Sequence, residues 1–249
     1  MSHHGPIVHF SSVAGAYAAY RPTYPTRLFD WLAAEAPAHD LAWDCGAGSG
    51  QASRALAERF ALVVATDASH AQLAAGERIP RVHVWAAPAE RSGIRSGRAN
   101  LIAVAQALHW FDLNAFYQEV RRVMRPGGLL AVWTYADPKL DGAPGRALAE
   151  FAVRVRAYWP AGRSLVDSGY RTIPFPFAER AVPAFAMTAE WPLDAVVGYV
   201  GTWSAVGAYR AAHRDDPTVR LRDELRRTWG DPAQPRRLTW SLSVRAARV

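Results

Sequence analysis

The sequence predicts an α/β fold with a doubly wound, mostly parallel sheet, and three observations lead to it. Short apolar and β-branched runs alternate with helical stretches between residues 41 and 135. A glycine-rich turn joins the first of these strands to its helix. The chain has 249 residues and is 50% hydrophobic, which is enough for a large core. Alternating β and α elements imply parallel strands with right-handed crossovers and helices on both faces.

The elements follow one another in a regular order through the first half of the chain. A helix is expected first over residues 11–20. A second helix is expected over residues 24–36, and Pro25 stands in its first turn. The turn Arg125-Pro-Gly-Gly128 ends a helix that begins at residue 113, as Pro and Gly do. Strands are expected at 41–45, 61–66, 81–85, 100–105 and 129–135, and the intervening helices at 51–60, 69–76 and 113–124.

The second half of the chain is less regular. Residues 136–181 are rich in Pro, Gly and aromatic residues, and we interpret them as an insert that covers the strand ends. A helix is expected at 145–158 within the insert, followed by a strand at 184–191, helices at 193–203 and 218–229, and a last strand at 237–244.

Composition and charge restrict the class of protein. No run approaches the roughly 20 apolar residues of a membrane span, and the start of the chain lacks the layout of a secretory signal. Cys45 is the single cysteine, which excludes an internal disulfide. We therefore expect a cytoplasmic enzyme. The formal charge of +7 comes from scattered arginines without interleaved aromatic residues, so nucleic-acid binding is disfavoured.

The strongest motif is Asp44-Cys-Gly-Ala-Gly-Ser-Gly50, which lies between a predicted strand and a predicted helix. Glycine lets the backbone turn tightly and approach a ligand closely. Asp67 stands at the end of the next strand, where a carboxylate accepts hydrogen bonds from ribose hydroxyls. This pattern fits either a dinucleotide or an S-adenosylmethionine site.

Two details favour S-adenosylmethionine. A dinucleotide motif wants Gly or Ala at position 51, whereas Gln51 stands there and the third glycine, Gly50, comes one residue early. The Asp44 carboxylate would repel a pyrophosphate, but it suits a ligand that carries an ammonium and a sulfonium. Charge complementarity therefore favours the methyl donor.

The chain resembles the class I S-adenosylmethionine-dependent methyltransferases with a type 11 domain, in particular the small-molecule group that includes trans-aconitate methyltransferase-like proteins. The segments that carry the resemblance are 20–25, 43–50, 65–67, 87–90, 105–112, 122–128 and 202–204. One departure is Asn100, which replaces the usual Asp near the fourth strand. By analogy, the sheet has seven strands in the order 3-2-1-4-5-7-6, with the last strand antiparallel.

The resemblance implies one methyltransferase domain over residues 1–249. Its parts are N-terminal lid helices (1–36), a cofactor-binding core (37–135), a substrate-cover insert (136–181) and a C-terminal part of the sheet and helices (182–249).

The resemblance also implies roles for single residues in binding S-adenosylmethionine. Asp44 and the loop backbone would hold the methionine end, and Asp67 the ribose. The cofactor-binding residues it implies are Tyr20 in the lid, Asp44, Gly46, Ala47, Gly48 and Gly50 in the loop, Asp67 and Ala68 after the second strand, Ala89 and Glu90 beside the adenine, and Gln106 and Ala107 beside the sulfonium.

Methyl transfer is an in-line displacement that needs alignment and exclusion of water, and a base only if the acceptor loses a proton. His109 follows the fourth strand, and its ordinary pKa near 6.5 makes it the candidate catalytic base or orienting donor. Packing of the cover is the alternative role. The candidate substrate-binding residues are Tyr17, Arg21, Tyr24, Trp110, Tyr135 and Trp203.

No metal site is expected, since no His pair has helical ligand spacing and no carboxylate cluster follows the fourth strand. The expected partner is a small-molecule acceptor, anionic or heteroaromatic, methylated on oxygen or nitrogen by a monomer or homodimer. The alternatives are a nucleic-acid methyltransferase, a nicotinamide-dependent oxidoreductase and a non-catalytic S-adenosylmethionine-binding protein.

Overall fold

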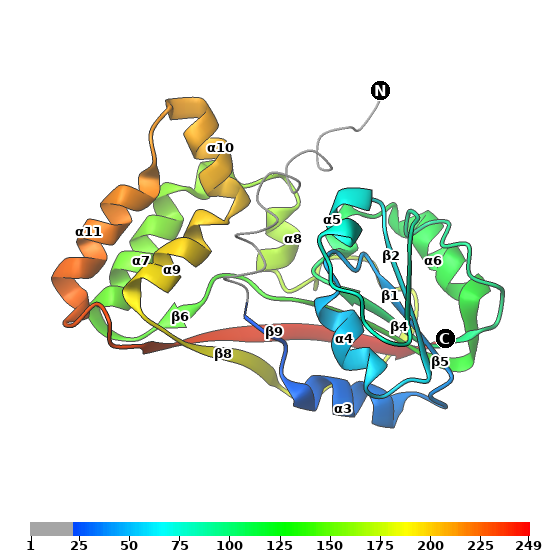
Figure 1. The fold of residues 1–249 in the computed structure, drawn as a ribbon. Coiled ribbons are helices and arrows are strands. Elements are labelled where there is room, and N and C mark those ends of the chain that lie inside the picture. The colour runs from blue at the N-terminus through cyan, green and yellow to red at the C-terminus, as the bar shows by residue number, and fades with distance from the viewer. Residues whose placement is uncertain (1–21) are drawn as a thin grey trace. The chain divides into compact units, whose positions relative to one another are not determined.

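The computed structural model describes residues 22–249, and within them the chain forms two compact units. The sheet unit consists of Tyr24–Tyr135, Ser164–Phe185 and Leu242–Val249. The helical unit includes Ala136–Arg163 and Ala186–Ser241. Figure 1 shows the elements of both units along the chain. The predicted insert therefore divides at residue 163, with its first part in the helical unit and the rest in the sheet unit.

The sheet confirms the predicted doubly wound architecture. Its order is β3-β2-β1-β4-β5-β9-β6, and β7 and β8 also pair with β9. Strands β1 to β5 pair in parallel, and β9 runs antiparallel to β5, as expected for the last strand. The strands are β1 (Leu41–Cys45), β2 (Leu62–Asp67), β3 (Val82–Ala86), β4 (Ala99–Ala105), β5 (Met124–Thr134), β6 (Lys139–Leu140), β7 (Ala178–Glu179), β8 (Phe185–Trp191) and β9 (Arg236–Arg248).

Strand β5 begins earlier than the predicted residue 129. Its first residue pairs with Ala99, and the register then shifts so that Leu129 pairs with Leu101. The glycines between them form a bulge, where Gly127 has a φ of +75° and donates to the Val249 carbonyl at 2.8 Å. The Pro-Gly-Gly turn therefore ends the preceding helix but lies inside the strand.

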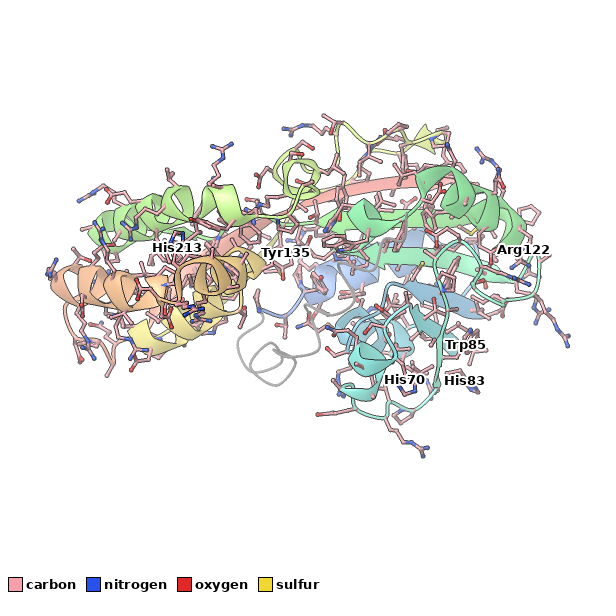
Figure 2. All side chains as sticks on the ribbon, turned by 90° about the horizontal axis from the view of Figure 1, so that it is seen from above. His70, His83, Trp85, Arg122, Tyr135 and His213 are labelled. Atoms are coloured by element: carbon pink, nitrogen blue, oxygen red, sulfur yellow. The ribbon has the colours of Figure 1, made fainter. Side chains whose placement is uncertain are left out.

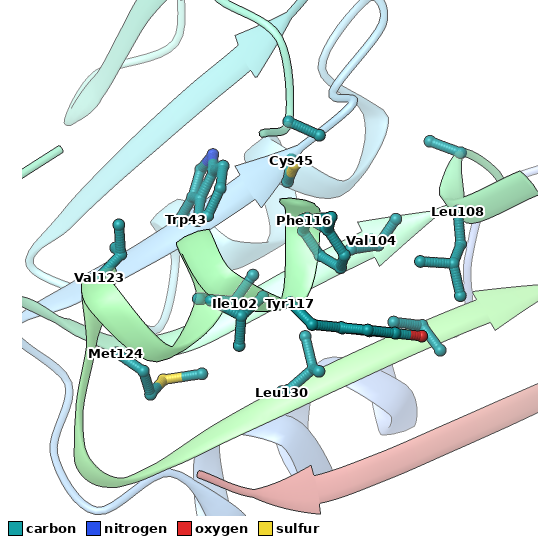
Figure 3. Packing of buried hydrophobic residues seen from close by; sticks show 14 of the residues in the cluster. Trp43, Cys45, Ile102, Val104, Leu108, Phe116, Tyr117, Val123, Met124 and Leu130 are labelled. Atoms are coloured by element: carbon teal, nitrogen blue, oxygen red, sulfur yellow. The ribbon is translucent and has the colours of Figure 1, made fainter. Parts of the chain in front are cut away.

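The central strands of the sheet unit are apolar because their side chains form its buried core. Trp43, Ile102 and Leu130 lie on three neighbouring strands and are fully buried (Figure 3). Phe116 and Val123 of helix α6 (Leu113–Val123) pack against them. Each such side chain contributes roughly 1.5–3 kcal/mol by leaving water. This packing holds β1 and β4 side by side, and the candidate site lies at their ends.

Three further helices belong to the sheet unit, one before β1, one after β1 and one after β2. They are α3 (Thr26–Glu35), α4 (Gln51–Ala57) and α5 (His70–Ala74). Ser69 caps α5 by accepting from the Gln72 amide, and Asp112 caps α6 by accepting from the Ala115 amide. The observed α4 is shorter than the predicted helix 51–60, and α5 is shorter than 69–76. After α4 the chain forms a turn in which the amides of Arg59 and Phe60 both donate to the Leu56 carbonyl.

Strand β3 forms one edge of the sheet, and its side chains are largely exposed. Val84 is 51% exposed and Trp85 37% exposed. Figure 2 shows His83 and Trp85 on this edge strand. The Trp85 indole is held by donating to the Ser92 carbonyl at 2.8 Å.

The helical unit is formed by helices around an aromatic core. Helix α11 (Pro217–Trp229) packs against α7 (Gly142–Arg154) and α9 (Leu193–Gly201). Helix α10 (Ser204–His213) was not expected, and the predicted helix 193–203 ends earlier, at Gly201. Trp203 has extended backbone angles and is the N-cap residue of α10, so the chain turns between α9 and α10.

The remaining short elements are α8 (Arg163–Asp167) and two 3-10 turns, at Leu108–Trp110 and Arg156–Tyr158. The predicted helix 145–158 is therefore α7 followed by a 3-10 turn. Among residues 22–249, no helix is both long and apolar enough to cross a bilayer.

Candidate active site

The candidate site lies in the sheet unit, at the carboxyl ends of β1, β2 and β4. Strand β1 lies between β2 and β4 in the sheet. The chain continues from β1 to β2 and β3 on one side and then crosses to β4 on the other side, so the strand order reverses at β1. Ligands of doubly wound sheets bind at such a switch point, beyond the carboxyl ends of the strands. The glycine loop, Asp67 and the residues after β4 all lie at this edge.

The glycine loop has backbone angles that require glycine. Gly46, Gly48 and Gly50 have φ values of +73°, +56° and +88°. A Cβ on Gly46 would lie 2.5 Å from the Cβ of Ala107, which is too close for any side chain. The amides of Gly46 and Ala47 donate to the Thr66 carbonyl at 2.8 and 2.9 Å. The first turn of the loop is therefore tied to β2 and packed against the residues after β4.

Asp44 is a buried carboxylate with unused hydrogen-bonding capacity. Its side chain has no exposed surface, and its Oδ2 accepts from the Ser53 hydroxyl at 2.5 Å. Its Oδ1 is buried and has no hydrogen-bond partner among the described residues. Burial is the main cause that raises the pKa of Asp44 to about 6; the hydrogen bonds from Ser53 oppose this rise, and the nearby Asp67 charge adds to it. A cationic donor beside Oδ1 would satisfy this oxygen and stabilise its charge.

Asp67 is held rigidly at the end of β2. Its Oδ2 accepts from the Gly48 amide at 2.9 Å, and its Oδ1 accepts from the Ser69 amide at 2.8 Å. A carboxylate offers about four lone-pair sites, so both oxygens retain capacity for hydroxyl donors. The same carboxylate thus shapes the loop and can bind a ribose. Ala68 beside it is exposed.

Ala89 and Glu90 follow β3. Ala89 is 7% exposed, and the half-buried Glu90 accepts from the Asp112 amide at 2.8 Å through Oε1. Glu90 therefore also anchors the start of α6, a role that the sequence did not indicate.

Gln106 has a left-handed backbone at the end of β4, with a φ of +58°. Its amide nitrogen Nε2 donates to the Tyr135 carbonyl at 2.9 Å, and its Oε1 accepts from the Thr134 hydroxyl. These bonds join the end of β4 to the end of β5. Ala107 follows it and lies against Gly46 of the glycine loop. The roles of Gln106 and Ala107 beside the sulfonium stay predictions.

His109 lies in the 3-10 turn that follows. Its Nδ1 is 2.8 Å from the hydroxyl of Tyr170, and its ring lies 4.7 Å from that of Trp110. Tyr170 is fully buried, whereas Trp110 is 41% exposed. Burial raises the pKa of Tyr170 well above its usual range, so the phenol stays protonated.

The predicted substrate-binding residues are distributed unevenly. Tyr24 and Tyr135 are near one another in the sheet unit, with ring centroids 6.3 Å apart. Trp203 belongs to the helical unit, is 4% exposed, and packs against Phe151 and Trp159. Tyr17, Tyr20 and Arg21 lie outside the described residues. The roles of all these side chains stay predictions.

Sequence reasoning missed Ser53, Thr134 and Tyr170. Ser53 lies one turn into the helix after the glycine loop, where its spacing from Asp44 could have suggested a partner. Nothing in the pattern indicated Tyr170, because it reaches His109 from a segment 61 residues further along the chain. Over residues 22–249, no group of three or more His, Cys, Asp or Glu residues is arranged to hold a metal ion.

Comparison with known proteins gives a consistent result. Residues 43–132 match the family described as "Methyltransferase domain". A Dictyostelium discoideum protein named as a methyltransferase is 30% identical over 221 residues, covering 87% of this chain and 84% of that protein. A Mycobacterium tuberculosis methyltransferase is 38% identical over 133 residues, covering 53% of this chain and 54% of that protein.

A solved structure supports the same conclusion. A protein described as a type II methyltransferase from Anaeromyxobacter dehalogenans is 44% identical, with a TM-score of 0.87, over 92% of this chain and 98% of that one. A doubly wound sheet with a glycine-rich loop at its switch point is typical of nucleotide-binding α/β enzymes. The chain belongs to the class I S-adenosylmethionine-dependent methyltransferases. This family excludes the oxidoreductase alternative.

Proposed function

We propose that the protein transfers a methyl group from S-adenosylmethionine to an oxygen or nitrogen of a small-molecule acceptor. The observation that carries this proposal is the buried Asp44 at the head of the glycine loop. Its Oδ1 lacks a donor among the described residues, and the ammonium of the cofactor's methionine end supplies one. A diphosphate at the same place would be repelled.

The surrounding residues fit the other parts of the cofactor. Asp67 accepts from the ribose hydroxyls while its amide contacts keep it in place. Ala68, Ala89 and Glu90 flank the adenine, and Gln106 and Ala107 lie toward the sulfur. When bound, S-adenosylmethionine supplies a methyl group on a positively charged sulfur. The chain itself then has to position the acceptor in line with that methyl group and exclude water.

A small acceptor is favoured over a nucleic acid by the segment after β4 and by the arginines. The segment Gln106-Ala-Leu-His109 lacks the acidic or amide residue, prolines and aromatic that base-methylating enzymes carry there. Many arginines are engaged with acids, such as Arg154 with Glu224 at 2.7 Å. Paired arginines offer less charge to phosphates.

The test is methyl transfer from S-adenosylmethionine labelled with tritium on the methyl group. The purified protein is incubated with a bacterial metabolite extract and, separately, with total RNA and with genomic DNA. We expect label in the small-molecule fraction. Label confined to RNA or DNA would overturn the acceptor class. The variant Asp67→Ala, in which cofactor binding is expected to be weaker, should transfer less label under the same conditions.

A further inference from the structure

Among the described residues, Ser53 alone donates a hydrogen bond to the Asp44 carboxylate. Both side chains are fully buried, and the Ser53 hydroxyl donates to Asp44 Oδ2 at 2.5 Å. The other oxygen, Oδ1, is buried without a partner in residues 22–249. A buried carboxylate without donors is costly to ionise. The charge state of Asp44 in the free protein therefore depends on Ser53.

The glycine loop brings Ser53 to this place. Helix α4 begins directly after Gly50, whose φ of +88° makes the turn between the loop and the helix. Ser53 lies in the first turn of α4, on the buried face that also carries Ala52 and Leu56. A buried hydroxyl on an apolar helix face needs a partner. Asp44 is the residue to which it donates.

The other groups around Asp44 supply no cation. On β2, Asp67 is the charged group that acts on Asp44, and it disfavours ionisation. The residues in register with Asp44 on β2 and β4 are both alanine. On β1, burial raises the pKa of the Cys45 thiol well above its usual range, so the thiol stays uncharged. On α4, Arg54 is exposed and pairs with Glu77 at 2.6 Å.

Two effects on the Asp44 carboxyl group oppose one another. Burial favours the neutral acid, because a buried charge loses its hydration. The hydrogen bonds from Ser53 favour the carboxylate, because a donor bonds more strongly to a charged oxygen than to a neutral one. With both effects present, the pKa of Asp44 is about 6. At pH 7.5 most molecules therefore carry the ionised form, in which Oδ1 is a free acceptor.

We propose that Ser53 is a positioning residue that keeps Asp44 ionised at neutral pH and leaves Oδ1 as the acceptor for the ammonium of the cofactor. This step rests on the proposed function. Where Asp44 is still protonated, cofactor binding breaks the O–H bond of its carboxyl group. The oxygen keeps the electron pair, the proton leaves to solvent, and the ammonium keeps its own hydrogens. Cofactor binding at mildly acidic pH is therefore coupled to the release of a proton from Asp44.

The affinity for the cofactor should rise with pH until Asp44 is ionised. Because binding favours the ionised form, the affinity is full above a pH of about 6 and falls below it, by up to roughly tenfold for each pH unit. Without the Ser53 hydroxyl, ionisation requires a higher pH, so the profile moves to alkaline pH by about one pH unit or more. A residue that only packed the helix would change the affinity equally at every pH.

The first measurement uses the free protein without cofactor. Carboxyl ¹³C spectra of the ¹³C-aspartate-labelled protein are recorded from pH 4 to 9, and Asp44→Asn identifies the signal. We expect a titration midpoint near pH 6 for Asp44, and a midpoint about one pH unit or more higher in Ser53→Ala. Ser53→Cys, a weaker donor of similar volume, should move the midpoint in the same direction, and it replaces Ser53→Ala if that variant does not fold. An Asp44 midpoint near its ordinary pKa of 3.8, or one unchanged in the variants, would overturn the proposal.

The second measurement is isothermal titration calorimetry with S-adenosylhomocysteine from pH 5.5 to 8.5, in two buffers of different ionisation enthalpy. The unchanged protein should release about half a proton at pH 6 and almost none at pH 8. Asp44→Asn, which cannot ionise, should release none.

The Ser53 variants separate the role in ionisation from packing. Ser53→Ala should bind weakly at pH 7 and recover toward pH 8.5, and Ser53→Thr, which retains the hydroxyl, should bring the pH profile back. An affinity loss in Ser53→Ala that is the same at every pH would refute the proposal. If the carboxyl titrations are as expected but S-adenosylhomocysteine does not bind, the proposed function fails and the control of Asp44 by Ser53 stands.

Discussion

At the scale of single residues, Asp44 connects stability with cofactor binding. The difference between its ordinary pKa of 3.8 and a pKa of about 6 corresponds to roughly 3 kcal/mol of preference for the protonated form. Since the pKa is higher in the folded state, this contribution is fully present below pH 4. It is lost as the pH rises through 6. The ionised carboxylate that suits the cofactor therefore costs stability in the free protein.

Replacing Asp44 by Asn removes this ionisation. We expect the free energy of unfolding of Asp44→Asn to decline less between pH 4.5 and 7 than that of the unchanged protein. Urea titrations at both pH values measure this. Calorimetry at pH 7.5 should show a weaker affinity for S-adenosylhomocysteine in the same variant. Equal pH dependence of the two proteins would show that Asp44 is not the titrating group.

Asp67 gives a second prediction at this scale. Removal of a charged acceptor of two hydroxyl hydrogen bonds costs about 1.5–3 kcal/mol or more, so Asp67→Ala should bind S-adenosylhomocysteine at least tenfold more weakly. The matched control is Asp223→Ala, at an exposed aspartate on α11. Equal affinity in both variants would place the ribose elsewhere.

At the scale of elements, the loop after β1 depends on close approach as well as on backbone angles. Gly46 and Gly97 both have left-handed φ values, +73° and +65°. A Cβ on Gly97 meets nothing within 4 Å, whereas one on Gly46 meets Ala107 at 2.5 Å. Alanine at Gly97 therefore measures the free energy that the left-handed backbone angle costs. Alanine at Gly46 adds to this the cost of the steric clash with Ala107.

Alanine at each position tests this difference. Gly97→Ala should lower the free energy of unfolding by about 1 kcal/mol through the backbone angle alone. Gly46→Ala should lower it by more and should also weaken binding of S-adenosylhomocysteine, since the loop and the segment after β4 must separate. Thermal denaturation and calorimetry measure the two effects. A Gly46→Ala variant no worse than Gly97→Ala would refute the close packing.

The regular elements were predictable where pattern and turn chemistry agreed. Strands β1, β2 and β4 and helix α6 follow from apolar runs and clear stop signals. The bulge in β5 was not predictable, because the register shift depends on pairing with Ala99 and on a bond from Gly127 to the end of the chain. Helix α10 was missed because the turn at Trp203 depends on tertiary packing.

At the scale of the whole molecule, the described residues of the candidate cofactor site all belong to the sheet unit. The glycine loop, Asp67 and Gln106 could be found from sequence, since short-range spacing places them at strand ends. The contact between His109 and Tyr170 could not, because Tyr170 comes from a segment that follows the helical part of the insert, 61 residues further along the chain. Long-range contacts of this kind leave no local pattern.

Because the candidate site lies in the sheet unit, bound cofactor should protect backbone amides of that unit from hydrogen exchange. A ligand at 100 times its dissociation constant stabilises the folded state by about 2.7 kcal/mol. Hydrogen–deuterium exchange should show slower exchange on addition of S-adenosylhomocysteine in peptides that span residues 44–50, 67–69 and 106–109. Protection confined to helices α9 to α11 would contradict the site.

The central claim is that the loop after β1 binds a cationic amino-acid tail rather than a diphosphate. Isothermal titration of the unchanged protein at pH 7.5 with S-adenosylhomocysteine, and separately with NAD, tests it most directly. We predict one molar equivalent of S-adenosylhomocysteine bound and no measurable heat from NAD. Binding of NAD with no response to S-adenosylhomocysteine would contradict the account.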